Sequence, residues 1–203
     1  MGSSPKLTAE LRWFFDHPLP FSEVFTSFSV SEPAERQDHY LLGSGERLGV
    51  KWREGNVEVK QQQGKAEVFA EQEVAGYLEQ WTKWSFALED KQALSLGSRW
   101  LPITKRCRLL TFAYDARRHT VSPETKLEDE NLCTLEYTHL TVVEGDYYTL
   151  GLEASGESNL VKPSLIQTIA YLSEHVHFEK LGLMQGNSSN YARWIQHRFT
   201  STL

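Results

Sequence analysis

The chain has 203 residues, with 21 Lys and Arg against 27 Asp and Glu, a formal net charge of −6, and 40% hydrophobic residues. This length predicts a single domain spanning residues 1–203, and the composition is that of a folded globular protein rather than a disordered one. The acidic balance argues against a broad nucleic-acid-binding surface, but it does not exclude a local basic pocket.

The N-terminal third of the sequence shows patterns typical of strands and short helices. Residues 10–15 predict a strand, residues 21–28 a short helix and residues 39–42 a second strand. The clearest pattern runs from Glu46 to Gln63, where two alternating runs flank a turn at residues 54–56. We expect a β-hairpin there.

The rest of the sequence predicts helices and long strands. Residues 72–88 predict a helix, because Val74, Leu78 and Trp81 fall on one helical stripe. Long antiparallel hairpins without β–α–β alternation indicate an α+β fold built on an antiparallel β-barrel or a strongly curved sheet, with flanking helices. The further elements expected are strands at residues 100–114, 131–143 and 147–154, a short strand near Thr120, and helices after Pro163 and over residues 191–195.

Basic side chains recur at alternate positions of several predicted strands. Such alternation is typical of a solvated strand face, but same-sign rows on neighbouring strands repel one another unless an anion lies among them. In a closed barrel with these faces inward, the lumen would be a positive channel suited to phosphate groups. The candidate phosphate-binding residues are Arg47, Lys51, Arg53, Lys60, Arg106 and Arg108.

Glutamates also stand at strand positions. Hard divalent cations such as Mg2+ and Mn2+ take carboxylate oxygens and bridge to substrate phosphates, whereas surface ion pairs are the alternative explanation. The candidate metal ligands are Glu10, Glu58, Glu136 and Glu153. No residue is assigned as catalytic.

The order of these motifs resembles the CYTH superfamily, the triphosphate tunnel metalloenzymes, which include thiamine triphosphatases, inorganic triphosphatases and one class of adenylyl cyclase. That family opens with Glu-x-Glu-x-Lys, continues with basic strands and ends with a late Glu-x-Glu strand. Residues 10–14 stand where the first motif belongs, residues 47–60 and 106–108 resemble the basic strands, and residues 151–153 the late acidic pair. The resemblance implies an eight-stranded antiparallel tunnel that holds a triphosphate and a divalent metal, Mg2+ or Mn2+.

Three positions depart from the family pattern. Arg12 replaces the second Glu of the first motif, Phe14 replaces its Lys, and Gly151 replaces one late Glu. Half of the expected metal ligands are therefore missing, and a cation stands where a carboxylate is expected. A guanidinium beside a Mg2+ site repels the ion and can stand in for part of its charge. We expect a tunnel that binds a small anionic phosphorylated ligand, and hydrolysis of that ligand stays open.

Other functions fit the same alternation. If the strands faced the other way, Leu48, Val50 and Trp52 would line the cavity, and the barrel would bind a small apolar or chromophoric ligand. A degenerate, non-catalytic interaction module is a third hypothesis. Without a signal-peptide core or a long apolar run, and with two cysteines far apart, the chain predicts a cytoplasmic location and no membrane partner.

Overall fold

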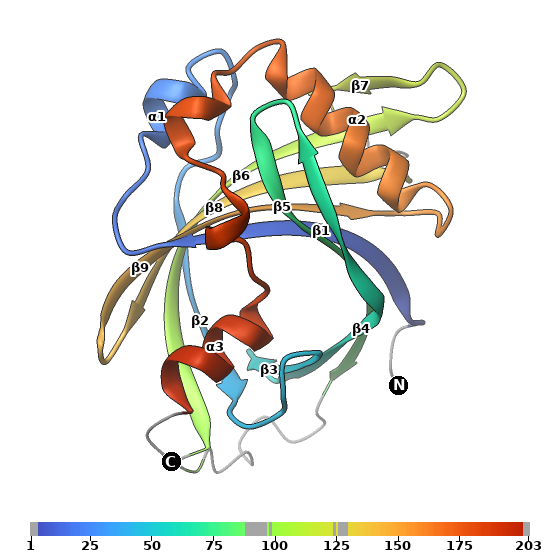
Figure 1. Cartoon of the computed structure of the whole chain (residues 1–203). Helices are drawn as coiled ribbons and strands as arrows, with labels where there is room; N and C mark the ends of the chain where they lie inside the picture. Colours follow the sequence, from blue (N-terminus) through green and yellow to red (C-terminus); the bar gives the residue numbers. More distant parts are fainter. Residues whose placement is uncertain (1–3, 88–96, 98, 124, 126–129, 201–203) are drawn as a thin grey trace.

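Antiparallel strands dominate the fold, which a computed structural model describes for residues 4–87, 97, 99–123, 125 and 130–200 (Figure 1). Within these residues, three α-helices and two short 3-10 helices accompany the strands: α1 (Phe21–Val24), α2 (Val161–Ser173), η1 (Phe178–Leu181), η2 (Gln185–Asn187) and α3 (Tyr191–Phe199). The strands are β1 (Lys6–Phe15), β2 (Ala34–Leu41), β3 (Leu48–Arg53), β4 (Asn56–Glu71), β5 (Val74–Ala87), β6 (Trp100–Asp115), β7 (Thr120–Ser122), β8 (Leu132–Val142) and β9 (Gly145–Ser155).

Eight of these strands close into a barrel. The order around it is β2-β3-β4-β5-β1-β9-β8-β6, and β6 pairs back with β2, so that neither strand is left as an open edge. The short strand β7 extends the sheet from the end of β6. The predicted α+β fold with an eight-stranded antiparallel barrel and flanking helices is confirmed.

The predicted hairpin at residues 46–63 is also confirmed, as β3 and β4. Val50 lies opposite Val59 across the hairpin, and the two turn residues Glu54 and Gly55 have φ angles of 49° and 80°. Two successive positive φ angles give the turn whose twist matches that of the flanking strands. The local sequence therefore specifies this part of the barrel on its own.

The helix predicted for residues 72–88 is wrong: the chain there forms β5, and Leu88 lies outside the described residues. The turn before it, at Gln72 and Glu73, has φ angles of 55° and 63° and folds β5 back along β4. The segment is rich in aromatic and β-branched residues, which favour strands. The apolar residues of this segment match a helical spacing by chance, and pairing with β4 and β1 makes the segment a strand.

Two other predicted elements differ in length. The helix expected over residues 21–28 is the single turn α1, and the strand expected from His39 begins earlier, at Ala34. The remaining predicted strands are confirmed within a few residues at their ends.

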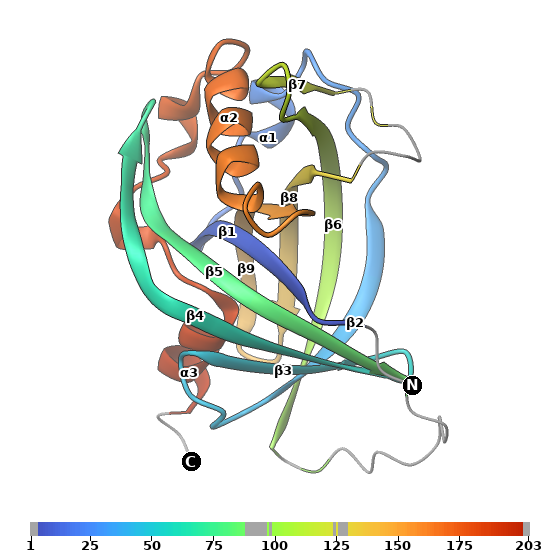
Figure 2. The same cartoon turned by 90° about the vertical axis from the view of Figure 1, so that its right-hand side faces the viewer.

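The main hydrophobic core lies outside the barrel, under α2. Leu165, Ile169 and Leu172 of α2 are fully buried in one cluster with Leu11 of β1 and Leu152 of β9. These strands therefore turn one apolar face outward to the helix and leave the opposite face to the lumen. Figures 1 and 2 show α1 and α2 at one end of the molecule and α3 at the other. None of the helices in the described residues is long and apolar enough to cross a membrane.

A second apolar cluster closes one end of the lumen around α3. Trp194 and Ile195 of α3 pack against Ile103 and Leu140, which point inward from β6 and β8. Asn190 caps the helix by accepting a hydrogen bond from the backbone N–H of Arg193.

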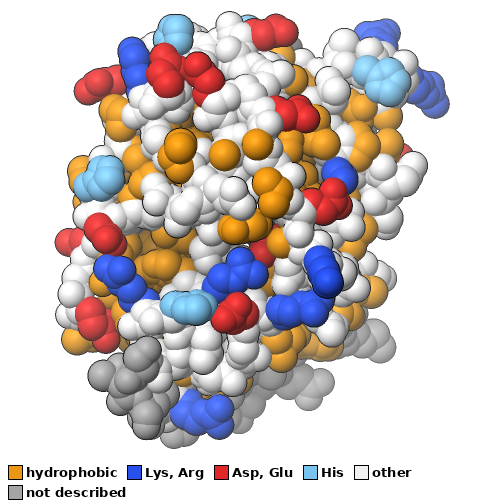
Figure 3. All heavy atoms as spheres, in the orientation of Figure 1, with side chains coloured by type: hydrophobic (Ala, Val, Ile, Leu, Met, Phe, Trp, Pro, Cys, Tyr) orange, Lys and Arg blue, Asp and Glu red, His pale blue; other side chains and the backbone are white. Residues whose placement is uncertain are grey.

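Polar contacts with acidic side chains also hold this helix at the surface. Glu46 binds both Arg193 (3.2 Å) and His197 (2.9 Å), and Arg198 binds Asp16 (2.9 Å). Figure 3 shows side chains of both charges gathered over this part of the surface. The helix is thereby held over the barrel end, so that the lumen beside it has a fixed wall.

Candidate functional site

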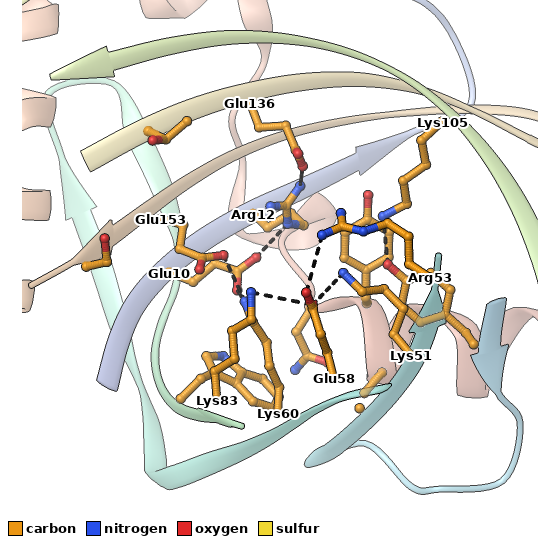
Figure 4. Close-up of a pocket in the computed structure, with 18 of the residues that line it drawn as sticks. Glu10, Arg12, Lys51, Arg53, Glu58, Lys60, Lys83, Lys105, Glu136 and Glu153 are labelled. Atoms are coloured by element: carbon orange, nitrogen blue, oxygen red, sulfur yellow. Dashed lines mark hydrogen bonds and ion pairs between the residues drawn. The ribbon is translucent and has the colours of Figure 1, made fainter. Parts of the chain in front are cut away.

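A cavity of about 300 Å³ lies in the barrel lumen, beside the apolar cluster around α3, which we call the apolar plug. Inward-facing residues at alternate strand positions line it, for example Glu10 and Arg12 on β1 and Lys51 and Arg53 on β3. Seven Lys and Arg side chains line the cavity against four Glu side chains. Figure 4 shows these charged groups converging from opposite sides of the barrel.

One side of the cavity is rich in cations. We call this side the cationic wall. It comprises Arg36 of β2, Lys51 and Arg53 of β3, Lys83 of β5 and Lys105 of β6.

Asp38 and Glu58 each pair with several cations of this wall, and Arg36 also pairs with Glu136 of β8 (3.3 Å). Glu58 lies 2.7 Å from Lys51, 3.4 Å from Arg53 and 3.4 Å from Lys83. Asp38 has no exposed surface, and four of the wall's cations lie within 3.3 to 4.0 Å of it. Its Oδ1 atom nevertheless accepts no hydrogen bond from the described residues. The cations on this wall therefore exceed their carboxylate partners.

Lys105 is the most deeply buried cation of this wall, with 2% of its side chain exposed. Its Nζ donates a hydrogen bond to the Tyr40 hydroxyl (2.7 Å) and lies 3.8 Å from the centre of the Tyr191 ring. Burial lowers the pKa of Lys105 to about 8, although the nearby charge of Asp38 opposes the shift. This ammonium therefore titrates within reach of neutral pH.

The opposite side of the cavity carries three glutamates. We call this side the carboxylate wall. It comprises Glu10 of β1, Glu136 of β8 and Glu153 of β9.

Two cations of the chain itself span the carboxylate wall. Arg12 donates from Nε to Glu10 (2.6 Å) and from Nη1 to Glu136 (3.1 Å). Lys60 donates from Nζ to Glu153 (2.8 Å) and to Glu10 (3.3 Å). Each of the three glutamates therefore has a protein cation in direct contact.

These contacts keep the buried carboxyls ionised. Burial raises the pKa of Glu10, but the charges of Lys60 and Arg12 outweigh it and lower the pKa to about 2. Burial is likewise outweighed at Glu136, where Arg12 contributes most and the pKa falls to about 2. Lys51 lowers the pKa of Glu58 to about 2 in the same way. All three remain carboxylates at neutral pH.

The structure brings most of the predicted site residues together. All four glutamates line the cavity, and so do three of the six predicted basic residues: Lys51, Arg53 and Lys60. Whether any of them binds phosphate or metal stays a prediction.

The other three basic residues do not reach the cavity. Arg47 precedes β3 and donates to the carbonyl of Gly64 (2.6 Å) on the exposed surface. Arg106 is exposed on the outer face of β6, and Arg108 donates to Ser22 (2.9 Å) outside the barrel. The predicted facing of β6 is therefore reversed: Lys105 points inward, because the neighbouring Ile103 joins the apolar plug in the lumen.

Sequence reasoning missed four cations of the cavity or gave them no ligand-binding role. Arg36 and its neighbour Asp38 lie on the part of β2 that was not predicted, and Lys83 lies on the strand mistaken for a helix. Lys105 was missed because β6 was predicted with Arg106 and Arg108 facing the lumen, which would turn Lys105 outward. Arg12 was identified only as a departure from the family motif. The alternation of Arg36, Asp38 and Tyr40 is the signal that a longer β2 would have exposed.

The residues present do not fit a divalent metal. Mg2+ and Mn2+ coordinate carboxylate oxygens that no protein cation already holds, but each glutamate here accepts hydrogen bonds from Arg12, Lys60 or the cationic wall. Within the described residues, no group of three or more His, Cys, Asp or Glu side chains is arranged to hold a metal ion. We therefore derive no chemical step through Mg2+ or Mn2+.

The lumen also differs from that of an apolar-ligand barrel. Gly49, Lys51 and Arg53 line the cavity, whereas Leu48 and Trp52 are not among its lining residues. Trp52 packs instead against His39, with the ring centres 5.1 Å apart. The facing of β3 is thus opposite to the one that the apolar-ligand hypothesis requires.

Comparison with known proteins adds little to this picture. No protein-family model matches the chain, and no curated protein does. Among solved structures, the chain is similar to the S. pombe Pct1 RNA triphosphatase in complex with the Spt5 CTD, at 9% identity and a TM-score of 0.38, over 86% of each chain. This likeness is too weak to show a family, so the assignment of the fold rests on the strand pairing and the function on the contacts in the cavity.

Proposed function

We propose that the barrel lumen binds a small polyanion of the triphosphate type. The observation that supports this most strongly is the cationic wall, where five Lys and Arg side chains from four strands have three carboxylate partners, Asp38, Glu58 and Glu136. An unbalanced group of cations, one buried and four partly buried, is costly unless an anion enters among them. Guanidinium and ammonium groups are the usual ligands of phosphate oxygens.

The shape of the site favours a small ligand with several charges. A cavity of about 300 Å³ is at the lower end of small-molecule sites, and its charges lie inside the barrel rather than on an open surface. A nucleic-acid partner would call for a basic outer face, whereas the chain as a whole is acidic. Low-dielectric walls strengthen the attraction between the inner cations and an anion.

We further propose that residues 1–203 form one domain distantly related to the triphosphate tunnel proteins. Three features support this: the closed eight-stranded antiparallel barrel, the inward rows of charges and the order of the motifs along the chain. Binding, rather than hydrolysis, is the activity that the contacts support.

Thermal unfolding with a series of anions tests the proposal. Tripolyphosphate is expected to raise the melting temperature more than pyrophosphate, and pyrophosphate more than orthophosphate, because more oxygens reach the cationic wall. Fatty acids serve as the probe for the apolar-ligand hypothesis. The Lys51→Ala variant should lose the tripolyphosphate shift, and the Arg106→Ala variant on the outer face should keep it. No shift with millimolar tripolyphosphate would overturn the proposed function.

A further inference from the structure

Arg12 occupies the centre of the carboxylate wall. Only 5% of its side chain is exposed, and its guanidinium donates to Glu10 (2.6 Å), Glu136 (3.1 Å) and Thr149 (3.4 Å). Its Cζ also lies 4.9 Å from the centre of the Tyr191 ring. A guanidinium held on several sides in this way is fixed in the lumen, and it cannot lose its charge at any physiological pH.

Gly151 provides the space that this guanidinium needs. Arg12 and Gly151 are direct partners across β1 and β9, and Gly151 also faces Glu136 across β8. A Cβ atom at position 151 would lie 2.5 Å from Cζ of Arg12 and 2.6 to 2.8 Å from its two terminal nitrogens. Any side chain at position 151 would therefore displace the guanidinium. The two departures from the family pattern are therefore linked, because the guanidinium of Arg12 fits only where position 151 has no side chain.

Lys60 completes the neutralisation of this wall. Its ammonium lies between Glu10 and Glu153, so the two cations and three glutamates form the continuous chain Glu136–Arg12–Glu10–Lys60–Glu153 (Figure 4). A divalent ion could reach the paired oxygens of Glu10 and Glu136 only by displacing a cationic head. Because both heads are tethered to strands of the closed barrel, they compete with the metal at a very high local concentration.

We propose that Arg12, seated over Gly151, is a built-in cation that takes the place of a divalent metal, so that the lumen binds its polyanion without Mg2+ or Mn2+. The inference has two halves. The first, that Arg12 excludes the metal, concerns the protein alone. The second, that the lumen binds its polyanion without a metal, rests on the proposed function.

The metal-exclusion half is tested with Mn2+ and protein in the absence of phosphate, because tripolyphosphate itself chelates the ion. Free Mn2+ is measured by electron paramagnetic resonance for the wild type and for Arg12→Ala/Gly151→Glu. The double variant removes the guanidinium and adds a fourth carboxylate to the wall. We expect its Mn2+ affinity to exceed that of the wild type by about tenfold or more. If the wild type binds Mn2+ as tightly as the double variant does, the inference is overturned.

Two further variants keep this test decisive. Thermal unfolding shows whether the double variant folds; if it does not, Arg12→Gln removes the charge at nearly the same volume and should raise Mn2+ affinity in the same direction. Arg106→Ala removes a cation from the outer face of β6 and should leave Mn2+ affinity unchanged. A similar gain in Arg106→Ala would show a general charge effect and would overturn the role given to Arg12.

The second half is tested by calorimetric titration of tripolyphosphate into the wild type, with and without EDTA. We expect the two dissociation constants to agree within about twofold, since the protein supplies all the positive charge. Binding that disappears in EDTA would overturn the inference while leaving the proposed function intact. Failure to bind in both buffers would remove the proposed function, and the Mn2+ comparison would still decide whether Arg12 excludes the metal.

Discussion

The two walls of the cavity use the same residue types to opposite effect. On the cationic wall, five cations share Asp38 and Glu58, and Arg36 also reaches Glu136 of the carboxylate wall, so positive charge is left over. On the carboxylate wall, three glutamates share Arg12 and Lys60, and each one is in contact with a cation. The comparison indicates that inward glutamates whose oxygens are already paired with cations of the chain are poor candidates for metal ligands. Pairing, and not the mere presence of carboxylates, decides what a charged lumen can bind.

Changing one charge on each wall gives the largest expected difference in tripolyphosphate affinity. Arg53 and Glu153 have nearly equal exposure, 29% and 30% of the side chain, on opposite walls. Arg53→Glu should weaken tripolyphosphate binding by about 100-fold or more, because it both removes a cation and adds an anion. Glu153→Gln should leave binding unchanged or strengthen it. Calorimetry of the two variants checks this, and equal losses would show that the walls do not differ in role.

Substitution of Gly151 tests the packing on the carboxylate wall. Gly151→Ala should lower the free energy of unfolding by about 1–3 kcal/mol, because its Cβ would overlap the Arg12 guanidinium. In the Arg12→Ala background, the same substitution should cost less, since the overlap is gone. Urea unfolding of the four proteins measures this coupling. If the two substitutions are simply additive, Gly151 does not make room for Arg12.

The pH dependence of binding tests the cationic wall. The pKa of Lys105 is about 8 in the folded protein, below its ordinary value of 10.5. Raising the pH from 7 to 9 therefore removes this charge and should weaken tripolyphosphate binding by about tenfold. The same shift means that the unfolded chain binds more protons between pH 8 and 10.5, so this group makes the fold more stable as pH rises across that window.

Lys105→Met is the matched control for this pH dependence. The charge of tripolyphosphate also changes between pH 7 and 9, and the variant retains that contribution while losing the lysine. Calorimetric titrations at both pH values should give a steeper loss of affinity for the wild type than for the variant. Parallel losses would show that Lys105 does not contact the anion.

The smallest effect is expected on the outer face of β6. Arg106 is exposed and adjoins Lys105 in the sequence, but it points away from the lumen. Arg106→Ala should change tripolyphosphate affinity by less than about twofold and the free energy of unfolding by about 0.5 kcal/mol or less. A loss of affinity comparable to that of Lys105→Met would mean that the facing of β6 is reversed.

Local sequence patterns predicted the parts of the fold that local interactions specify. The β3–β4 hairpin followed from its own alternation and turn, several such hairpins indicated a barrel or a curved sheet, and the family resemblance implied the closed eight-stranded barrel. The strand β5 could not be recognised, because Val74, Leu78 and Trp81 match a helical spacing by chance and only pairing with β1 and β4 distinguishes the two. Partners distant in sequence determine this element.

The candidate site was predicted unevenly for the same reason. Lys51, Arg53 and Lys60 lie on the hairpin, where the inward face is continuous, and all three line the cavity. On β6, a shift of one residue decides whether Lys105 or Arg106 faces the lumen. Packing of Ile103 into the apolar plug around α3 turns Lys105 inward. The contact of Arg12 with Gly151 joins residues 139 positions apart, and it becomes visible only when β1 and β9 are paired.

Tripolyphosphate binding to the wild-type protein in EDTA tests the central claim most directly. If the lumen's own cations hold a polyanion, calorimetry should show saturable binding at one site. Added Mg2+ should not increase the affinity, and it should only lower the concentration of free tripolyphosphate by chelating it. Binding that is absent in EDTA and appears only with Mg2+ or Mn2+ would contradict the account.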